Sequence, residues 1–450
     1  MASRSLARQL ACLSLILASA CGDGTGSDTS DLDRDLRRAL AEAEVGPLEP
    51  LPAQDPALVQ LGQVLMFDKL LSGNRDVSCA TCHHPASGSG DALSLAVGTG
   101  GAGSGAGRTP GAGRPFVSRN SPPVFNLGFA GFTALFWDGR VARRPDGGFD
   151  TPAGGRLPPG VANPLAAQAM IPVATPLEMR GQPGDLDRFG NVNELAALAD
   201  DDFPAIWHAI MDRVLAVQQY IAMFEAAYPG VPTSQLGFQH AANAIAAFEI
   251  AAFTRTNSPF DRYLAGDDGA LSEEAKQGGL LFYGKAACSS CHAGPHLTDQ
   301  QFHNVGVPQL GPGMGTEAPE DFGRGLITGA AGERYQFRTP PLRNVELTGP
   351  YMHDGAFTTL RAAVAHYLDV AASLRSYDAS QLDPALRGSL VSDAAGVDRI
   401  LATLDTRVSG RLDLSAADVD AIVEFLKSLT DPEPLAPAPA TVPSGLPLQD

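Results

Sequence analysis

The sequence predicts a mainly α-helical protein that is built from two similar halves. Apolar residues recur at three- and four-residue spacing in "AIWHAIMDRVLAVQQYIAMFEAAY" and "HAANAIAAFEIAAFTR", which is the period of an amphipathic helix. No segment shows a convincing strand alternation. In addition, "LGQVLMFDKLLSGNRDVSCATCH" is echoed by "GGLLFYGKAACSSCH", and "SRNSPPVFNLGFAGFTALFWDGR" by "FRTPPLRNVELTGPYMHDGAF". Such an internal repeat indicates the duplication of one domain.

The length and the charge of the chain limit what it can be. With 450 residues it is long enough for two domains, since one domain usually has roughly 100–200 residues. We place the first domain at residues 55–250 and the second at residues 251–430. The formal net charge is −18, and Lys and Arg occur only singly or in scattered pairs, which argues against a nucleic-acid partner. A basic electron carrier or a neutral protein surface fits this acidic chain better.

Local signals mark one helix and three irregular segments. Ser415 and Asp418 form a capping pair for a helix over residues 415–430. Segments rich in Gly or Pro are expected to be loops or disordered, and they lie at residues 97–114, at residues 145–160 and in the Pro-rich tail 431–450.

The first residues have the features of a secretory signal. Basic residues precede the short apolar core "LACLSLILASA", and small residues stand directly before Cys21. We predict a signal peptide at residues 1–20, lipidation of Cys21 as in bacterial lipoproteins, and a lipid-anchored flexible linker at residues 21–54. The alternative is ordinary signal cleavage with an incidental Cys21. In either case the chain leaves the cytoplasm, and we expect it on the periplasmic side of a bacterial membrane.

The cysteines point to a cofactor. Of the six, one lies in the signal and one is Cys21, and the other four form the two motifs "CATCH" (79–83) and "CSSCH" (288–292). In an exported chain two CxxC pairs suggest disulfides, and they could also be the half-sites of a zinc tetrad. Neither explanation accounts for the His after both pairs, whereas C-x-x-C-H is the attachment sequence of haem c. We therefore predict two covalently bound haems c.

The spacing of the motif follows from the chemistry of attachment. Two thiols one helical turn apart can add to the two vinyl groups of a porphyrin, and the next residue then presents its imidazole to the iron. The fold class is therefore mainly α, with two cytochrome c-like haem domains related by internal duplication. The attaching and ligating residues are Cys79, Cys82 and His83 in the first half and Cys288, Cys291 and His292 in the second.

A series of motifs then follows in a fixed order between residues 55 and 430: "CATCH", "SRNSPPVFN", "FWDGR", "NPLAAQAMIPVATPLEM", "CSSCH", "TGPYMHDGAFTTL" and "AVAHY". In this order the chain resembles the bacterial di-haem cytochrome c peroxidases and their MauG-type relatives. The resemblance implies cleavage of hydrogen peroxide at the N-terminal haem. It also implies that electrons reach that haem through the C-terminal haem from a donor outside the protein.

The resemblance bears on the space opposite His83. Family members that draw on cytochrome c carry a distal His in the loop after the first CxxCH, but here no His occurs between His84 and His208. His84 adjoins the proximal ligand, so we expect it to be a loop residue that bonds a propionate or water. The distal position should therefore hold water or nothing, and the first haem should be high-spin in the oxidised protein.

The family places a Gln, a Pro and a Glu above the first iron, and Gln168, Pro172 and Glu178 match that motif with its spacing. By resemblance, Glu178 shuttles the proton during O–O cleavage, Gln168 orients the peroxide and Pro172 restricts the pocket. Taken alone, "PLEM" would be a turn with an exposed carboxylate. The stretch from Trp137 to Gln168 is longer than the family norm, so we expect an inserted loop to reshape the mouth of the pocket.

Further positions match the family between the two haems. Trp137 in "FWDGR" corresponds to an aromatic residue that relays electrons or holes, and a buried core Trp is the alternative. Asn120, Thr348 and Pro350 match the positions that hold a calcium ion between the haem domains, and Ca²⁺ prefers such oxygen ligands. Without the matching motifs, each of these three would be read as a turn former.

The sixth ligand of the second haem separates the two branches of the family. It is a Met downstream of "HDG" in the cytochrome-c-fed peroxidases and a Tyr in MauG, and counting along "HDGAFTTLRAAVAHY" puts Tyr367 there. A thioether raises the haem potential, whereas a phenolate oxygen favours the higher iron oxidation states. We favour Tyr367 as the ligand. Met352 as ligand and a buried, non-ligating Tyr367 are the alternatives.

Several function hypotheses follow. The first is an exported MauG-like enzyme that cleaves hydrogen peroxide and passes oxidising equivalents to a protein substrate or to a donor such as a small cytochrome c or a cupredoxin. The others are a cytochrome-c-fed peroxidase that removes hydrogen peroxide, a non-catalytic di-haem electron-transfer lipoprotein, and a haem-based sensor. Electron transfer alone would need strong sixth ligands on both irons, and the first loop offers no His. A sensor would need an output domain, and none is left over.

Overall fold

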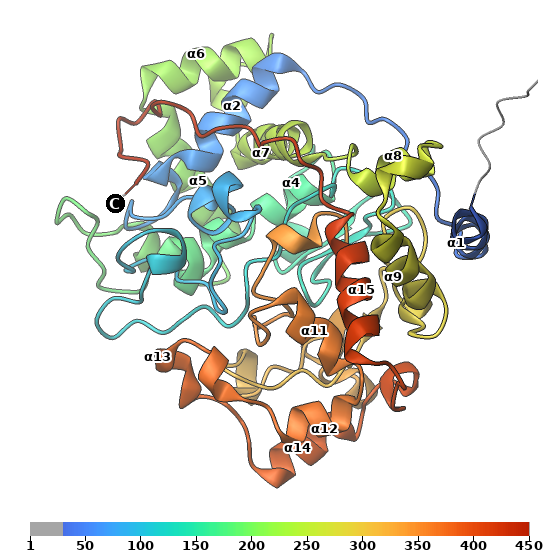
Figure 1. The fold of residues 1–450 in the computed structure, drawn as a ribbon. Coiled ribbons are helices and arrows are strands. Elements are labelled where there is room, and N and C mark those ends of the chain that lie inside the picture. The colour runs from blue at the N-terminus through green and yellow to red at the C-terminus, as the bar shows by residue number, and fades with distance from the viewer. Residues whose placement is uncertain (1–29, 450) are drawn as a thin grey trace, which may run out of the picture.

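The computed structural model describes residues 30–449. The predicted signal peptide at residues 1–20 and the predicted lipidation site Cys21 lie outside the described residues. In the part of the chain that is described, no helix is both long enough and apolar enough to cross a lipid bilayer. The chain is mainly helical, and the helices of the first half lie above most of those of the second in Figure 1.

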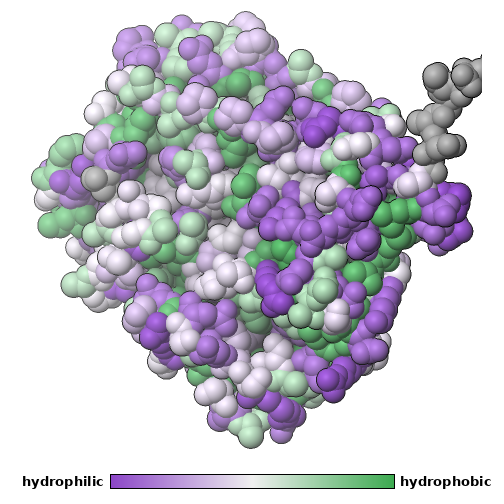
Figure 2. Space-filling model, in the orientation of Figure 1, coloured by the Kyte–Doolittle hydropathy of each residue, from purple (hydrophilic) through white to green (hydrophobic). Residues whose placement is uncertain are grey.

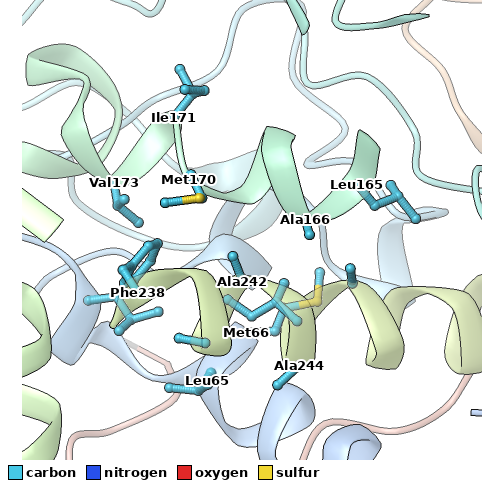
Figure 3. Packing of buried hydrophobic residues seen from close by; sticks show 14 of the residues in the cluster. Leu65, Met66, Leu165, Ala166, Met170, Ile171, Val173, Phe238, Ala242 and Ala244 are labelled. Atoms are coloured by element: carbon cyan, nitrogen blue, oxygen red, sulfur yellow. The ribbon is translucent and has the colours of Figure 1, made fainter. Parts of the chain in front are cut away.

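The core of the first half is formed by α2 (Pro56–Phe67), α4 (Pro164–Ala169) and α7 (Phe238–Phe253). Their apolar faces meet in Figure 3, where Met66 of α2 lies close to Ala244 of α7. The backbones of α2 and α7 approach so closely that a Cβ on Gly62 would lie 1.8 Å from the carbonyl oxygen of Ala244. A larger residue than Gly at this position would push the two helices apart.

The second half repeats this arrangement with α9 (Glu273–Tyr283) and α15 (Ala416–Lys427). A Cβ on Gly278 of α9 would lie 1.8 Å from the carbonyl oxygen of Ala421 in α15. In both halves, therefore, a Gly in the helix before CxxCH lets that helix touch the last helix of the same half. This equivalence supports the predicted duplication. The capping prediction is also confirmed, since Ser415 and Asp418 form a reciprocal capping box at the start of α15.

Further helices complete the fold. The first half also contains α3 (Cys79–Cys82), α5 (Phe203–Leu215) and α6 (Gln218–Ala227). The second half also contains α8 (Pro259–Leu264), α10 (Arg324–Thr328), α11 (Leu360–His366), α12 (Val370–Arg375), α13 (Pro384–Arg387) and α14 (Ala394–Leu401).

The strands are too short to have been predicted from alternation. β1 (Ala134–Leu135), β2 (Val141–Arg143) and β3 (Phe149–Asp150) form one antiparallel sheet, and β4 (Phe302–His303) pairs antiparallel with β5 (Phe337–Arg338). β3 lies within residues 145–160, which were expected to form a loop or a disordered segment. That segment is ordered because Phe149 and Ala153 are buried in the core of the first half.

The N-terminal end of the described chain packs on the second half. α1 (Asp31–Glu42) places Leu36 and Leu40 in the core formed with α9 and α15, and the Lys276 ammonium lies 2.7 Å from the Asp33 carboxylate. The prediction of a flexible linker over residues 21–54 is therefore wrong for α1. Apart from Asp33, its charges lie on the more exposed face, which is hydrophilic in Figure 2. These charges made the segment look solvated, although Leu36 and Leu40 are buried on the other face.

The C-terminal end packs on the opposite half. Beyond α15 the tail runs back over the first half, drawn in red in Figure 1, where Val442 and Leu446 join the buried core. The Ser444 hydroxyl donates a 2.6 Å hydrogen bond to the buried Asp68 carboxylate. The tail has neither helix nor strand, as predicted, but these contacts fix it in place. Each end of the chain thus stabilises the half that it does not belong to.

Candidate active site

A cavity in the first half brings together most of the residues that the sequence singled out. With its mouth, which opens to solvent, it holds about 970 Å³ of empty space. Its walls are formed by α3, by the segment around "FWDGR", by α4 and by α7. The predicted residues that line it are Cys79, Cys82, His83, Asn120, Trp137, Gln168, Pro172 and Glu178.

One wall is the CATCH segment. α3 is a single helical turn that is held at its start by Ser78, whose backbone N–H donates to the Thr81 hydroxyl at 2.9 Å. Directly after it, Nδ1 of His83 lies 3.2 Å from the carbonyl oxygen of Ser89. This contact engages one ring nitrogen with a backbone oxygen and leaves Nε2 for a ligand in the cavity.

Another wall carries the three residues that match the distal motif. Gln168 lies in the last turn of α4, Pro172 starts a 3₁₀ turn, and Glu178 lies in a π-helical turn that begins at Pro176. The backbone oxygen of Glu178 accepts a 3.0 Å hydrogen bond from Thr99 of the Gly-rich loop, so this loop holds the turn in place. Three short helical turns, each with a proline at its start, therefore place Gln168, Pro172 and Glu178 in the wall of the same cavity.

Glu178 is mostly buried, with 23% of its side chain exposed. Burial raises the pKa of its carboxyl group, and the positive charges of Arg140 and Arg119 oppose that rise. The nearest of these groups is Arg140, whose guanidinium nitrogen Nη2 lies 4.0 Å from Oε1 of Glu178. A carboxyl group whose pKa is moved toward neutrality in a cavity is a natural proton carrier.

Arg140 belongs to a chain of buried charges that the sequence did not reveal. Asp138, which is fully buried, lies 2.6 Å from Arg119 and 3.1 Å from Arg140. Arg119 in turn lies 2.6 Å from Asp321 of the second half. The motif "FWDGR" contained two of these residues, but only the fold shows that they lie beside Glu178 and connect it with the other half.

Trp137 lies where the halves meet. Its side chain is 7% exposed and lines the cavity, and its indole N–H donates a 2.9 Å hydrogen bond to the carbonyl oxygen of Asn120. Its own carbonyl oxygen accepts a 2.7 Å hydrogen bond from Arg338 in β5 of the second half. The position agrees with the expected relay between two cofactors and equally with a core Trp.

Glu249 of α7 is a further residue of the cavity that the sequence reading missed. It makes no hydrogen bond and no ion pair within the described part of the chain, and burial raises its pKa to about 8. The signal was present, because Glu249 is the only acidic residue in the apolar helix α7.

The CSSCH segment of the second half is arranged in a similar way but lies nearer the surface. Cys288–Ser290 forms a 3₁₀ turn, and Nδ1 of His292 lies 2.9 Å from the carbonyl oxygen of Leu297. Tyr367 follows the end of α11. Burial raises the pKa of its phenol, as do the nearby Cys291 and Cys288 thiols, and its hydroxyl forms no hydrogen bond with any other described residue.

Beside Cys291, a cluster of charged side chains approaches the second CxxCH. Cys291, Asp299 and His303 lie within 4.8 Å of one another, but the ring nitrogens of His303 are engaged at 2.8 Å by Asp299 and by Asp405. Although burial opposes it, the hydrogen bond to Asp299 helps raise the pKa of His303 to about 10. The imidazole thus lies between two carboxylates, and Nη2 of Arg407 lies 2.6 Å from its Nδ1.

The residues predicted for calcium lie at the junction of the halves. The backbone N–H of Asn120 donates a 2.8 Å hydrogen bond to the carbonyl oxygen of His353, three residues beyond Pro350. The Asn120 side-chain nitrogen donates to the carbonyl oxygen of Leu93 at 2.7 Å, and the Thr348 hydroxyl donates to that of Val345 at 3.0 Å. Calcium binding here stays a prediction.

Two other expectations concern the rim of the cavity. His84 accepts a 3.1 Å hydrogen bond from the backbone N–H of Ala86 and lies edge-on to Phe67, with ring centroids 6.2 Å apart. It is a loop residue, as expected, with protein partners. None of residues 145–160 lines the cavity, and Phe149 and Ala153 of this loop are buried in the core of the first half instead.

The residues present fit haem c better than zinc or disulfides. The four described cysteines are free thiols, and the sole described cluster of His, Cys and acidic residues contains one cysteine rather than both pairs. Burial raises the pKa values of Cys79 and Cys288 to about 12, as expected for thiols in apolar surroundings. Each pair instead precedes a His with one nitrogen held by a backbone oxygen, and the first pair lies at a cavity.

The comparisons with known proteins agree. A family profile described as di-haem cytochrome c peroxidase matches residues 56–269. The methylamine utilization protein MauG of Methylorubrum extorquens is 32% identical over 355 residues, which are 78% of this chain and 78% of that protein. The cytochrome c551 peroxidase of Pseudomonas aeruginosa is 32% identical over 309 residues, which are 68% of this chain and 70% of that protein.

Among solved structures, a MauG-like protein associated with microbial copper homeostasis has a TM-score of 0.57 and 25% identity, covering 86% of this chain and 93% of that one. The mainly helical duplicated fold, the two CxxCH motifs and these relatives lead to one conclusion. The chain belongs to the di-haem cytochrome c peroxidase and MauG family of oxidoreductases, with two haems c as its cofactors.

Proposed function

We propose that this enzyme cleaves hydrogen peroxide in the cavity of the first half and, like MauG, passes the oxidising equivalents through the second half to a protein substrate or another electron donor. The observation that carries the MauG-like assignment is the position of Tyr367. Its half-buried phenol makes no hydrogen bond with any described residue and lies close enough to Cys288 and Cys291 to interact with them electrostatically. A phenol in this position suits a hard oxygen ligand to iron.

The residues of the cavity divide the work of peroxide cleavage. A haem held by Cys79, Cys82 and His83 would supply the electrons that break the O–O bond. Glu178 takes a proton from one oxygen of hydrogen peroxide and delivers it to the other, which leaves as water. Gln168 offers an amide to orient the peroxide, and Pro172 has no N–H and narrows the space above His83. Since no His lies between residues 84 and 208, we expect the site to be open in the oxidised protein.

The ligand experiment decides between the branches. The oxidised holoprotein is examined by absorption and electron paramagnetic resonance spectroscopy, together with Tyr367→Phe and Met352→Leu. We expect a change at one haem in Tyr367→Phe alone, while the other haem still binds cyanide. We also expect slow turnover with reduced cytochrome c. A Met–His spectrum that Met352→Leu removes, or fast turnover with cytochrome c, would move the enzyme to the other branch.

A second candidate function is removal of hydrogen peroxide with electrons from a small cytochrome c. The observation in its favour is the surface position of the CSSCH segment, where Ser290 is exposed and a soluble carrier can come close. The cytochrome c551 peroxidase among the relatives uses this type of donor, as its name states. Turnover with reduced cytochrome c measures the share of this function directly.

We also propose that the enzyme works on the periplasmic side of a bacterial membrane, with calcium at Asn120, Thr348 and Pro350 and a lipid at Cys21. The motifs that carry the family resemblance support the calcium site, and the signal-like first residues support the lipid. Chelation of calcium should loosen the contact between the halves. Loss of membrane association in Cys21→Ser is the corresponding test of the anchor.

A further inference from the structure

Arg140 lines the cavity of the first half and has no part in the mechanism described above. Its guanidinium lies over the Phe136 ring, with the central carbon 3.8 Å from the ring centroid. Nη1 lies 3.1 Å from a carboxylate oxygen of Asp138, and the backbone N–H of Arg140 donates to the other oxygen at 3.1 Å. These contacts hold Arg140 against the wall of the cavity, and 13% of its side chain is exposed.

The second terminal nitrogen of this guanidinium, Nη2, faces Glu178. Nη2 lies 4.0 Å from Oε1 of Glu178, which is longer than a hydrogen bond of about 2.7–3.2 Å. An oxygen atom could therefore lie between the two groups at about 2.8 Å from each. A water molecule or the outer oxygen of hydrogen peroxide has this size, and it would bring its proton next to the carboxylate.

The neighbouring charges leave Arg140 as the cation available to Glu178. Arg119 is engaged on one side by Asp138 and on the other by Asp321. Asp138 opposes the effect of the arginines on Glu178, but its influence is the smallest of the causes that act on this carboxyl. The remaining group that faces Glu178 is the Cys82 thiol of α3, and it loses its ionisable proton when it forms the thioether to haem.

Glu249 shows what the same cavity does to a carboxyl group without such a cation. It lines the cavity from α7, it has no ionic or hydrogen-bonding partner among the described residues, and its pKa is raised to about 8 by burial. At neutral pH such a group keeps its proton and cannot accept another. Glu178 is equally enclosed but faces Arg140, and the two carboxyl groups are therefore expected to differ in charge.

We propose that Arg140 is a positioning residue of the peroxide site, which keeps Glu178 ionised and directs it toward an oxygen atom shared between the two side chains. This inference rests on the proposed role of Glu178 in peroxide cleavage. It deepens that role, because it assigns the charge state that lets Glu178 act first as a base and then as an acid.

The test uses cyanide binding to the oxidised holoprotein, which does not depend on turnover. Hydrogen cyanide must give its proton to a base in the cavity before cyanide binds the iron, so the association rate should fall as pH drops through the pKa of that base. In Arg140→Gln we expect this midpoint to rise by about one pH unit or more, a roughly tenfold change in proton affinity. Arg140→Lys, which keeps the positive charge, should have a midpoint close to that of the wild type.

Two controls separate the possible failures. Arg144→Gln changes a neighbouring arginine that is 45% exposed, and it should leave the midpoint in place. Glu178→Gln should abolish the pH step. If the step disappears in Glu178→Gln but stays in place in Arg140→Gln, the inference on Arg140 is wrong and the role of Glu178 stands. If Glu178→Gln keeps the step, the proposed function of Glu178 is wrong.

An infrared measurement covers the case in which Arg140→Gln loses its haems. The difference spectrum between the wild type and Glu178→Gln isolates the bands of Glu178. A carboxylate band at neutral pH supports the inference, and a carboxylic acid band at that pH overturns it.

Discussion

The two CxxCH motifs share one sequence pattern but lie in different surroundings. CATCH forms a helical turn whose Ala80 is 4% exposed, and it faces a cavity that also holds Glu178 and Arg140. CSSCH forms a 3₁₀ turn with an exposed Ser290, and its neighbours are the phenol of Tyr367 and the His303 cluster. Duplication therefore kept the attachment geometry and changed what surrounds it.

The difference suits a division of labour. An enclosed, partly polar cavity with a movable proton favours bond cleavage, because buried charges and dipoles act strongly where water is excluded. A surface position favours exchange of electrons with a partner. The same pattern of Gly in the helix before the motif, at Gly62 and Gly278, shows that the frame itself is not what distinguishes the halves.

The largest effect is expected from the proton carrier of the enclosed half. Glu178→Gln keeps the size of the side chain and both haems but cannot accept a proton, so we expect peroxide cleavage to slow by about 100-fold or more. Rapid mixing of the holoprotein with hydrogen peroxide measures this rate. Glu225→Gln, on the exposed side of α6, is the matched control. Equal rates in the wild type and in Glu178→Gln would remove the chemical distinction between the halves.

The sequence predicted the chemistry of the cavity better than its electrostatics. Cys79 and His83 belong to an attachment motif, Glu178 matches a family motif by resemblance, and the fold brings all three to one cavity. Arg140 and Glu249 could not be placed, because their effect depends on which distant segments face them. Arginines are common on protein surfaces, and only the burial of Arg140 beside a carboxyl group indicates a functional role.

The sequence also misled where charge hid a packed element. The segment "DLDRDLRRALAE" reads as solvated, yet Leu36 is buried against the second half. A stripe of two leucines is a weak signal in one helix. It becomes stable only because α9 of another domain supplies the opposite face, and tertiary packing of this kind cannot be read from local periodicity.

The next largest effect, on the free energy of unfolding, is expected where α1 packs on the second half and the C-terminal tail packs on the first. These contacts test whether the halves unfold as separate units. Leu36→Ala removes a fully buried side chain from the second half and should lower the free energy of unfolding by about 2–4 kcal/mol. Val442→Ala, in the tail on the first half, should cost about 1 kcal/mol. Hydrogen exchange would localise each loss, and we expect it in the half where the side chain packs. A loss spread evenly over both halves would mean that they unfold as one unit.

The smallest expected effect is a different pH dependence of stability in the two halves. The pKa of Glu249 is raised by burial from 4.5 to about 8 in the folded protein, so the folded state binds the proton more tightly. Its contribution to stability is complete below about pH 4.5 and is lost as pH rises toward 8. Glu249→Gln, which stays neutral, should therefore remove this pH-dependent loss of stability.

In the second half the corresponding group is His303, whose pKa is raised from 6.5 to about 10, although burial opposes the rise. The stability that the protonated ring provides is complete below about pH 6.5 and is lost as pH rises through 10. When Cys291 forms the thioether to haem, it can no longer carry the negative charge of a thiolate. Asp299 and Asp405 then remain to hold the proton of His303, so the loss of stability should begin at a pH lower than 10. Melting temperatures of the holoprotein, of Glu249→Gln and of His303→Asn between about pH 5 and pH 10 should therefore show two separate losses of a few degrees each. If one variant removed both losses of stability, the titrations of Glu249 and His303 would be coupled. The two halves would then not be electrostatically independent of each other.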